Sequence, residues 1–143
     1  MARVLALDVG SKRIGVAVSD ELRLTARPYG MIPRETYNKN AVAIATVVTD
    51  LGADRVVVGL PLGPAGNDTE QTARTRRFAD MLSTRLPVPV EMWDETLTTV
   101  AAKAIVPAGR KARQTGRVDA VAAAVLLQSY LDHHFQAQSS LES

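Results

Sequence analysis

Residues 4–19, VLALDVGSKRIGVAVS, contain two β-rich apolar runs on either side of a short polar turn. The first run, Val4 to Val9, holds the acid Asp8, and the second run, Ile14 to Val18, is mostly β-branched. Two such runs around a glycine-containing turn predict a β-hairpin. A charge inside an apolar strand is costly unless it lies at an exposed strand end or binds something. Asp8 is therefore a candidate functional residue, with a turn-initiating acid as the structural alternative.

The rest of the chain alternates strands and helices. A third strand is expected around Tyr29 to Pro33, and apolar spacing and turn residues predict the later elements. These are a helix over 38–51 that ends at Gly52, a strand over 55–60, a helix over 69–86, a strand over 88–93, a helix over 96–105, a basic loop over 108–116 and a buried helix over 118–131. An antiparallel opening followed by this alternation implies an α/β fold with a mixed sheet covered by helices. We expect one domain over residues 1–134 and a polar tail over 135–143.

Composition excludes several classes of protein. The 143 residues include no Cys, which removes disulfides, zinc–thiolate sites and iron–sulfur clusters. Apolar residues make up 46% of the chain and charged residues 22%, which fits one globular domain with a sizeable core. No apolar run approaches the roughly 18 residues of a membrane span, and Asp8 ends the first run too early for a signal peptide. We therefore expect a cytoplasmic protein that does not interact with membranes.

Three acids stand where sites of α/β proteins assemble, at the ends of strands and the start of a helix. Asp8 ends the first strand, Glu95 follows the strand that ends at Trp93, and Asp119 opens the most apolar helix. Taken singly, each has a structural alternative, which is a turn for Asp8 and helix capping for the other two. Together, three carboxylates without nitrogen or sulfur ligands favour Mg²⁺ or Mn²⁺, and paired hard cations are the usual device for phosphodiester hydrolysis. These three acids are our candidate catalytic and metal-binding residues.

The net charge is only +2, but positive charge is concentrated in places. No acid lies between Thr96 and Val118, and further cations adjoin Asp8 in the first turn. The candidate nucleic-acid-binding residues are Lys12, Arg13, Arg110, Lys111, Arg113 and Arg117. A solvated charged face is the alternative for any such group. Beside predicted metal-binding acids, however, cations fit a phosphate backbone that enters the site.

Four segments resemble, in order, the motifs of the YqgF family, also called RuvX. They are Asp8 to Asp20, Val58 to Leu62, Asp94 to Thr99 and Asp119 to Leu131. The resemblance implies a ribonuclease-H-like fold, in which a three-stranded antiparallel meander continues into parallel strands and helices flank the sheet. It also implies a metal-dependent nuclease whose acids are the same three residues. Three positions depart from the family pattern, namely Thr96, the segment Gly63 to Gly66, and Ala120.

The expected activity is processing of the 5′ end of pre-16S ribosomal RNA. One alternative is a Holliday junction resolvase that acts on branched DNA, and another is a catalytically silent RNA-binding factor of ribosome assembly. A resolvase would most simply be a dimer, so both a monomer and a homodimer stay open. An actin-like ATPase also opens on a hairpin with an Asp-x-Gly turn, but its two lobes need more than 143 residues.

Overall fold

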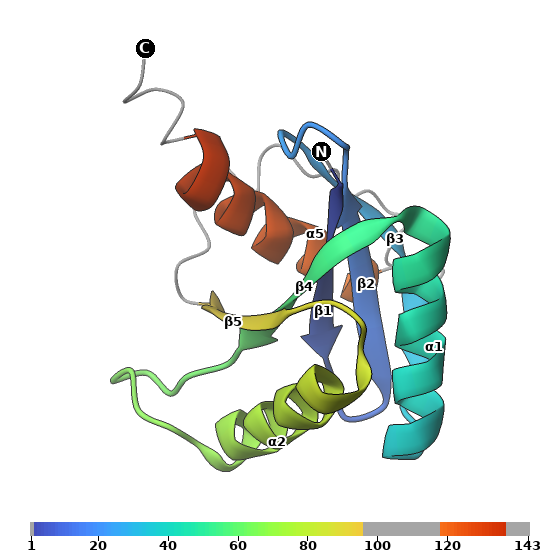
Figure 1. The fold of residues 1–143 in the computed structure, drawn as a ribbon. Coiled ribbons are helices and arrows are strands. Elements are labelled where there is room, and N and C mark those ends of the chain that lie inside the picture. Colours follow the sequence, from blue (N-terminus) through green and yellow to red (C-terminus); the bar gives the residue numbers. More distant parts are fainter. Residues whose placement is uncertain (1, 96–117, 137–143) are drawn as a thin grey trace.

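The computed structural model describes residues 2–95 and 118–136, which form one five-stranded sheet with helices on both faces (Figure 1). The strand order is β3-β2-β1-β4-β5. The strands are β1 (Arg3–Val9), β2 (Arg13–Ser19), β3 (Ala26–Pro33), β4 (Ala53–Leu60) and β5 (Val90–Asp94). β1, β2 and β3 form an antiparallel meander, and β4 and β5 continue the sheet in parallel from β1. The mixed sheet expected from the sequence is confirmed. The expected helix over 96–105 and the loop over 108–116 lie outside the described residues.

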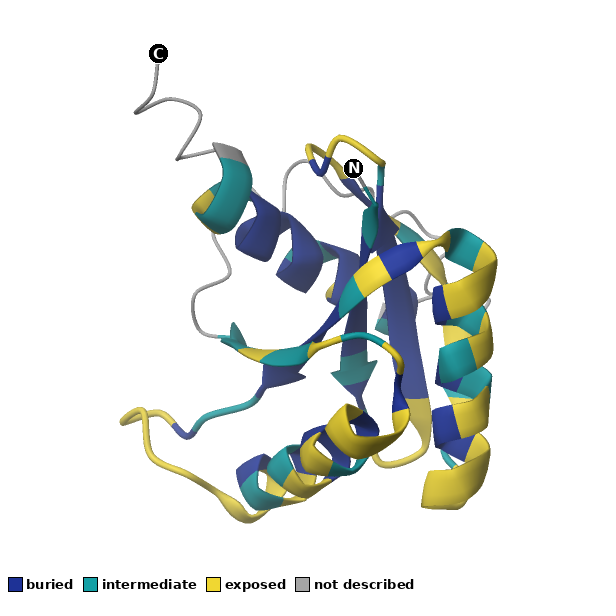
Figure 2. Ribbon diagram, viewed as in Figure 1, coloured by how far each residue is buried: buried dark blue, intermediate teal, exposed yellow. Residues whose placement is uncertain are grey.

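The helices form two layers that bury opposite faces of the sheet. α1 (Tyr37–Leu51) and α2 (Glu70–Arg85) cover one face, and α5 (Val118–Leu131) covers the other (Figure 1). Successive residues of a strand point to opposite faces, so β1 supplies both cores. Leu5 and Leu7 pack toward α1 and α2, whereas Val4 and Ala6 pack toward α5. Burial on both faces explains why β1 and β2 are almost continuously apolar (Figure 2).

Local sequence signals set the ends of α1 and α2. The Thr36 hydroxyl accepts a hydrogen bond from the Lys39 amide at 3.2 Å, and Gly52 ends α1 with a φ of 65°. The expected stop at Gly52 is confirmed, because the left-handed conformation that closes this helix favours glycine. Thr69 caps α2 by a capping box with Thr72. It therefore stands just outside the helix that the sequence predicted to begin at this residue.

The C-terminal end of α5 is held by an aromatic cluster. The Trp93 ring packs edge-on against the Tyr130 ring with centroids 5.5 Å apart, and His134 lies 4.3 Å from Tyr130 by ring centroids. A π-helical turn, η2 (Asp132–Gln136), continues α5, and the Arg23 guanidinium lies 5.1 Å from the Phe135 ring. Phe135, the first residue of the expected polar tail over 135–143, thus packs against this part of the fold. Among the helices described, none is both long and apolar enough to span a bilayer.

Candidate active site

Asp8 lies one residue before the end of β1, on the sheet face that α5 covers. This orientation follows from strand alternation, because Val4 and Ala6 point to the same face and pack against α5. Asp8 pairs with Gly15 on β2, and Leu7 pairs with Val58 on β4, so Gly59 lies beside Asp8 on its other side. Asp8 is thus flanked on both neighbouring strands by residues without a side chain.

The two flanking glycines leave space that the other two acids occupy. A Cβ at Gly15 would collide with the main-chain oxygen of Asp119, so the first turn of α5 lies directly on β2. A Cβ at Gly59 would lie 2.8 Å from Oε1 of Glu95. Glycine inside a strand commonly marks such a close approach. Residues from β1, the end of β5 and the start of α5 therefore converge at one edge of the sheet.

Asp8 and Glu95 share a hydrogen bond between their carboxyl groups. Burial raises the pKa of Asp8, the hydrogen bond from Glu95 lowers it, and the negative charge of Asp119 raises it, with a net upward result. Burial, the charge of Asp8, the hydrogen bond to Asp8 and the charge of Asp94 together raise the pKa of Glu95 to about 7. Glu95 is thus the protonated member of the pair, and its O–H group donates the hydrogen bond to the Asp8 carboxylate, as expected for two close carboxyls.

Asp119 has a cationic partner on the first hairpin. Nε of Arg13 donates a hydrogen bond to Oδ2 of Asp119 at 2.8 Å, and the two side chains are 48% and 29% exposed. Arg13, predicted to contact nucleic acid, therefore also holds one of the predicted acids. Lys12 is exposed in the neighbouring turn. The other predicted nucleic-acid-binding residues lie outside the described residues; they are Arg110, Lys111, Arg113 and Arg117.

The donor set of the site fits a hard divalent cation, although the acids do not face one common point. Within residues 2–95 and 118–136, no group of three or more His, Cys, Asp or Glu side chains is placed to hold a metal ion. Arg13 engages the Asp119 carboxylate, and a side-chain hydrogen bond joins Glu95 to Asp8. Carboxylate oxygens are nevertheless the ligands that Mg²⁺ and Mn²⁺ prefer, and a buried carboxylate pair gains from a cation in place of the proton.

The acids and Arg13 were candidates from the sequence, but the two glycines were not. Gly15 and Gly59 each interrupt a run of apolar, mostly β-branched residues. An isolated glycine in such a run is a signal for close approach of another chain segment. Read in that way, the sequence could have indicated that other parts of the chain pass directly over β2 and β4.

Comparison with known proteins identifies close relatives over nearly the whole chain. The sequence pattern of the RuvX family, described as Holliday junction resolvase, matches residues 2–133. A protein of Myxococcus xanthus named "Putative pre-16S rRNA nuclease" is 42% identical over 134 residues, which cover 92% of this chain and 89% of that protein. A protein of the same name from Chloroflexus aggregans is 44% identical over 131 residues, which cover 90% and 92% of the two chains.

Solved structures share the fold at low sequence identity. The structure of Thermus thermophilus RuvC in complex with a Holliday junction substrate superposes with a TM-score of 0.57 at 15% identity, and the match covers 94% of this chain and 97% of that one. The fowlpox virus Holliday junction resolvase matches with a TM-score of 0.53 at 15% identity, over 92% and 99% of the two chains. The fold is thus ribonuclease-H-like, as expected from the sequence.

Proposed function

The chain belongs to the RuvX family, and from this premise we propose that it is a metal-dependent nuclease that processes the 5′ end of pre-16S ribosomal RNA. The names of the relatives support both the reaction and the substrate. The observation that carries the proposal is the convergence of Asp8, Glu95 and Asp119 at the glycine-lined edge of the sheet. As a ribosomal RNA nuclease, the protein would act in the cytoplasm.

Asp8 and Glu95 are the residues that would hold Mg²⁺ or Mn²⁺ first, with Asp119 as the third carboxylate. When bound, such a cation activates water and stabilises the charge that develops on a phosphate. Glu95 must give up the proton that it shares with Asp8 before both carboxylates are available as ligands. Activity should therefore weaken as the pH falls below about 7, the pKa of Glu95. This loss would come from protonation of a ligand, without unfolding.

Arg13 orients the third carboxylate and lies where a phosphate backbone would enter. Its guanidinium has several N–H donors, and Asp119 engages one of them at 2.8 Å. A phosphate oxygen that accepts from Arg13 would compete with Asp119 and leave this carboxylate free to turn toward Asp8. Lys12 adds a second exposed cation in the neighbouring turn. We propose that both residues contact phosphates, together with four cations of the segment that precedes α5, namely Arg110, Lys111, Arg113 and Arg117.

A Holliday junction resolvase is the second candidate function. It is favoured by the description of the family and by the fold shared with a junction-bound RuvC. A resolvase must cut two strands symmetrically, which most simply requires a homodimer, whereas RNA processing needs only a monomer. We rank RNA first because the relatives at 42–44% identity carry the name of an RNA nuclease.

The deciding experiment compares cleavage of end-labelled pre-16S RNA and of a four-way DNA junction at equal salt, with Mg²⁺ or Mn²⁺. We expect the wild-type protein to cut the RNA faster and Asp8→Asn to cut neither substrate. Asp80→Asn is the matched control, because Asp80 is an exposed acid of α2 on the other layer of the fold. Paired symmetric cuts of the junction that outpace RNA cleavage would favour the resolvase. RNA binding without cleavage under either metal would instead favour the silent assembly factor.

A further inference from the structure

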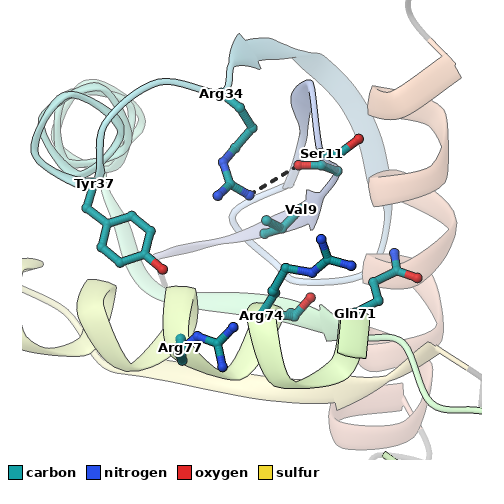
Figure 3. A pocket seen from close by; sticks show the side chains of 9 residues that line it. Val9, Ser11, Arg34, Tyr37, Gln71, Arg74 and Arg77 are labelled. Atoms are coloured by element: carbon teal, nitrogen blue, oxygen red, sulfur yellow. Dashed lines mark hydrogen bonds between the residues drawn. The ribbon is translucent and has the colours of Figure 1, made fainter. Parts of the chain in front are cut away.

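A cavity of about 550 Å³ lies between the β1–β2 turn, the start of α1 and the first half of α2 (Figure 3). Val9 lines it, whereas the neighbouring Asp8 points to the opposite face of the sheet. The cavity is therefore separate from the acidic site, although both lie at the carboxyl end of β1. Its volume is within the usual range for pockets that bind small molecules, about 300–1,000 Å³.

Three arginines line this cavity and no acid does. Arg34, which directly follows β3, is fixed in place by two contacts. Its Nη1 donates to the Gly10 carbonyl oxygen at 3.2 Å, and its guanidinium lies 4.9 Å from the centroid of the Phe78 ring. From the opposite wall, Arg74 points into the same space (Figure 3). Arg34 is thus held in place on one side of the cavity and faces Arg74 on the other side.

The arginines of α2 differ in whether they have an acidic partner. Arg74 and Arg77 are exposed and one turn apart, and neither forms an ion pair with any acid of the described chain. Arg76 lies between them in sequence but pairs with Asp68 at 3.2 Å. Like charges three residues apart on a helix destabilise it slightly. With Arg34 also lining the cavity, an anion bound there would offset the repulsion among the three cations.

The remaining lining adds neutral hydrogen-bonding groups and one aromatic ring. Ser11 supplies a hydroxyl, Gln71 supplies an amide, and the side chain of Tyr37 borders the opening (Figure 3). Tyr37 is 41% exposed, and its ring packs edge-on against the Phe78 ring with centroids 5.9 Å apart. Aromatic side chains of this kind stack on nucleobases.

From these groups we propose that the cavity binds a phosphorylated nucleotide, whose phosphate lies between Arg34, Arg74 and Arg77. Guanidinium groups match phosphate oxygens in geometry and charge. Two sources provide this chemistry, which are a free mononucleotide and a nucleotide unit of an RNA strand. The proposal does not rest on the nuclease activity proposed above, because binding is measured without cleavage.

The test measures binding by isothermal titration calorimetry in EDTA, which prevents cleavage. The probes are adenosine 5′-monophosphate, adenosine, inorganic phosphate and a short 5′-phosphorylated RNA oligonucleotide. The double variant Arg74→Gln/Arg77→Gln removes two cations of the cavity. The matched control is Arg76→Gln/Arg85→Gln, which removes two cations of the same helix whose partners are Asp68 and Asn38.

We expect the cavity variant to bind the phosphorylated probe at least about tenfold more weakly than the wild type, because charge-assisted hydrogen bonds are lost. The control variant should keep the wild-type affinity. Binding of the mononucleotide identifies a free nucleotide as the source, and binding of the oligonucleotide alone identifies a unit of an RNA strand. The proposal is overturned if neither the mononucleotide nor the oligonucleotide binds, if adenosine or inorganic phosphate binds as tightly as the tighter of these two probes, or if both variants lose the same affinity.

Discussion

Replacing Glu95 by Gln should stabilise the fold while abolishing cleavage. The pKa of Glu95 rises from its ordinary value of 4.5 to about 7 on folding, so between these values the folded protein keeps a proton that the unfolded chain has released. The free energy of unfolding of the wild type therefore falls as the pH rises through this window. Above pH 7 Glu95 is ionised in the folded protein, and the loss of stability from its ionisation is complete. A Gln amide donates a hydrogen bond to Asp8 at every pH, which removes this loss of stability.

The size of this gain follows from the same values. A rise in pKa from 4.5 to about 7 corresponds to about 3 kcal/mol in the free energy of unfolding. Solvent screens part of this, because the Glu95 side chain is only partly buried. We therefore expect Glu95→Gln to be more stable than the wild type by about 1–2 kcal/mol at pH 8 and nearly equal to it at pH 5.

Urea unfolding followed by circular dichroism in EDTA measures this difference at both pH values. Glu21→Gln is the matched control, because the Glu21 side chain is 73% exposed and should give wild-type stability at each pH. Adding Mg²⁺ at pH 8 should stabilise the wild type more than the Gln variant, since a ligand that binds only the folded state raises its stability. A Glu95→Gln protein that is no more stable than the wild type at pH 8 would refute the shared-proton description of the site.

Further perturbations test the remaining features of the fold and the site. Gly59→Ala places a Cβ 2.8 Å from Oε1 of Glu95, so we expect cleavage to be lost at a cost of about 1–3 kcal/mol in stability, measured by urea unfolding and by the RNA assay. Gly15→Ala meets the main chain of Asp119 instead of a movable side chain, so its loss of thermal stability should exceed that of Gly59→Ala. Burial and the neighbouring charge of His133 lower the pKa of His134, so stability is complete above its unfolded value of 6.5 and is lost as the pH falls through the folded value. His134→Gln should flatten this loss between pH 7 and pH 5, and an unchanged slope would contradict the assignment. For the basic segment before α5, a triple alanine variant should reduce the slope of log affinity against log salt by about two or three; its members are Arg110, Lys111 and Arg113.

Much of the fold was predictable because buried strands and helix faces consist mainly of apolar residues. β1 and β2 are buried on both faces, and their apolar runs predicted the bounds of both strands to within one residue. β3 was predicted to begin at Tyr29, but it begins at Ala26. As an edge strand it tolerates Pro28, and after Ala26 it alternates exposed and partly buried residues, so its first half lacks the apolar signal of a central strand.

The sequence singled out the three acids as candidates because a charge at the end of an apolar strand or at the start of an apolar helix has few explanations. Their contacts were not predictable. Arg13 and Asp119 are 106 residues apart in the chain, and no local pattern relates them. The cavity formed by Arg34 and Arg74 was missed for the same reason, since these residues come from elements that meet only in the folded structure.

The aromatic cluster at the end of α5 gives the chain a built-in spectroscopic reporter. Trp93 is the single tryptophan of the sequence, and it lies two residues before Glu95. Its ring packs against Tyr130, so its emission depends on whether α5 is docked on the sheet. Because Asp119 is carried by the same helix, intrinsic fluorescence would report assembly of the acidic site without an attached label. If the Trp93 fluorescence changed at a lower urea concentration than the far-ultraviolet circular dichroism, α5 would leave the sheet before the sheet unfolds.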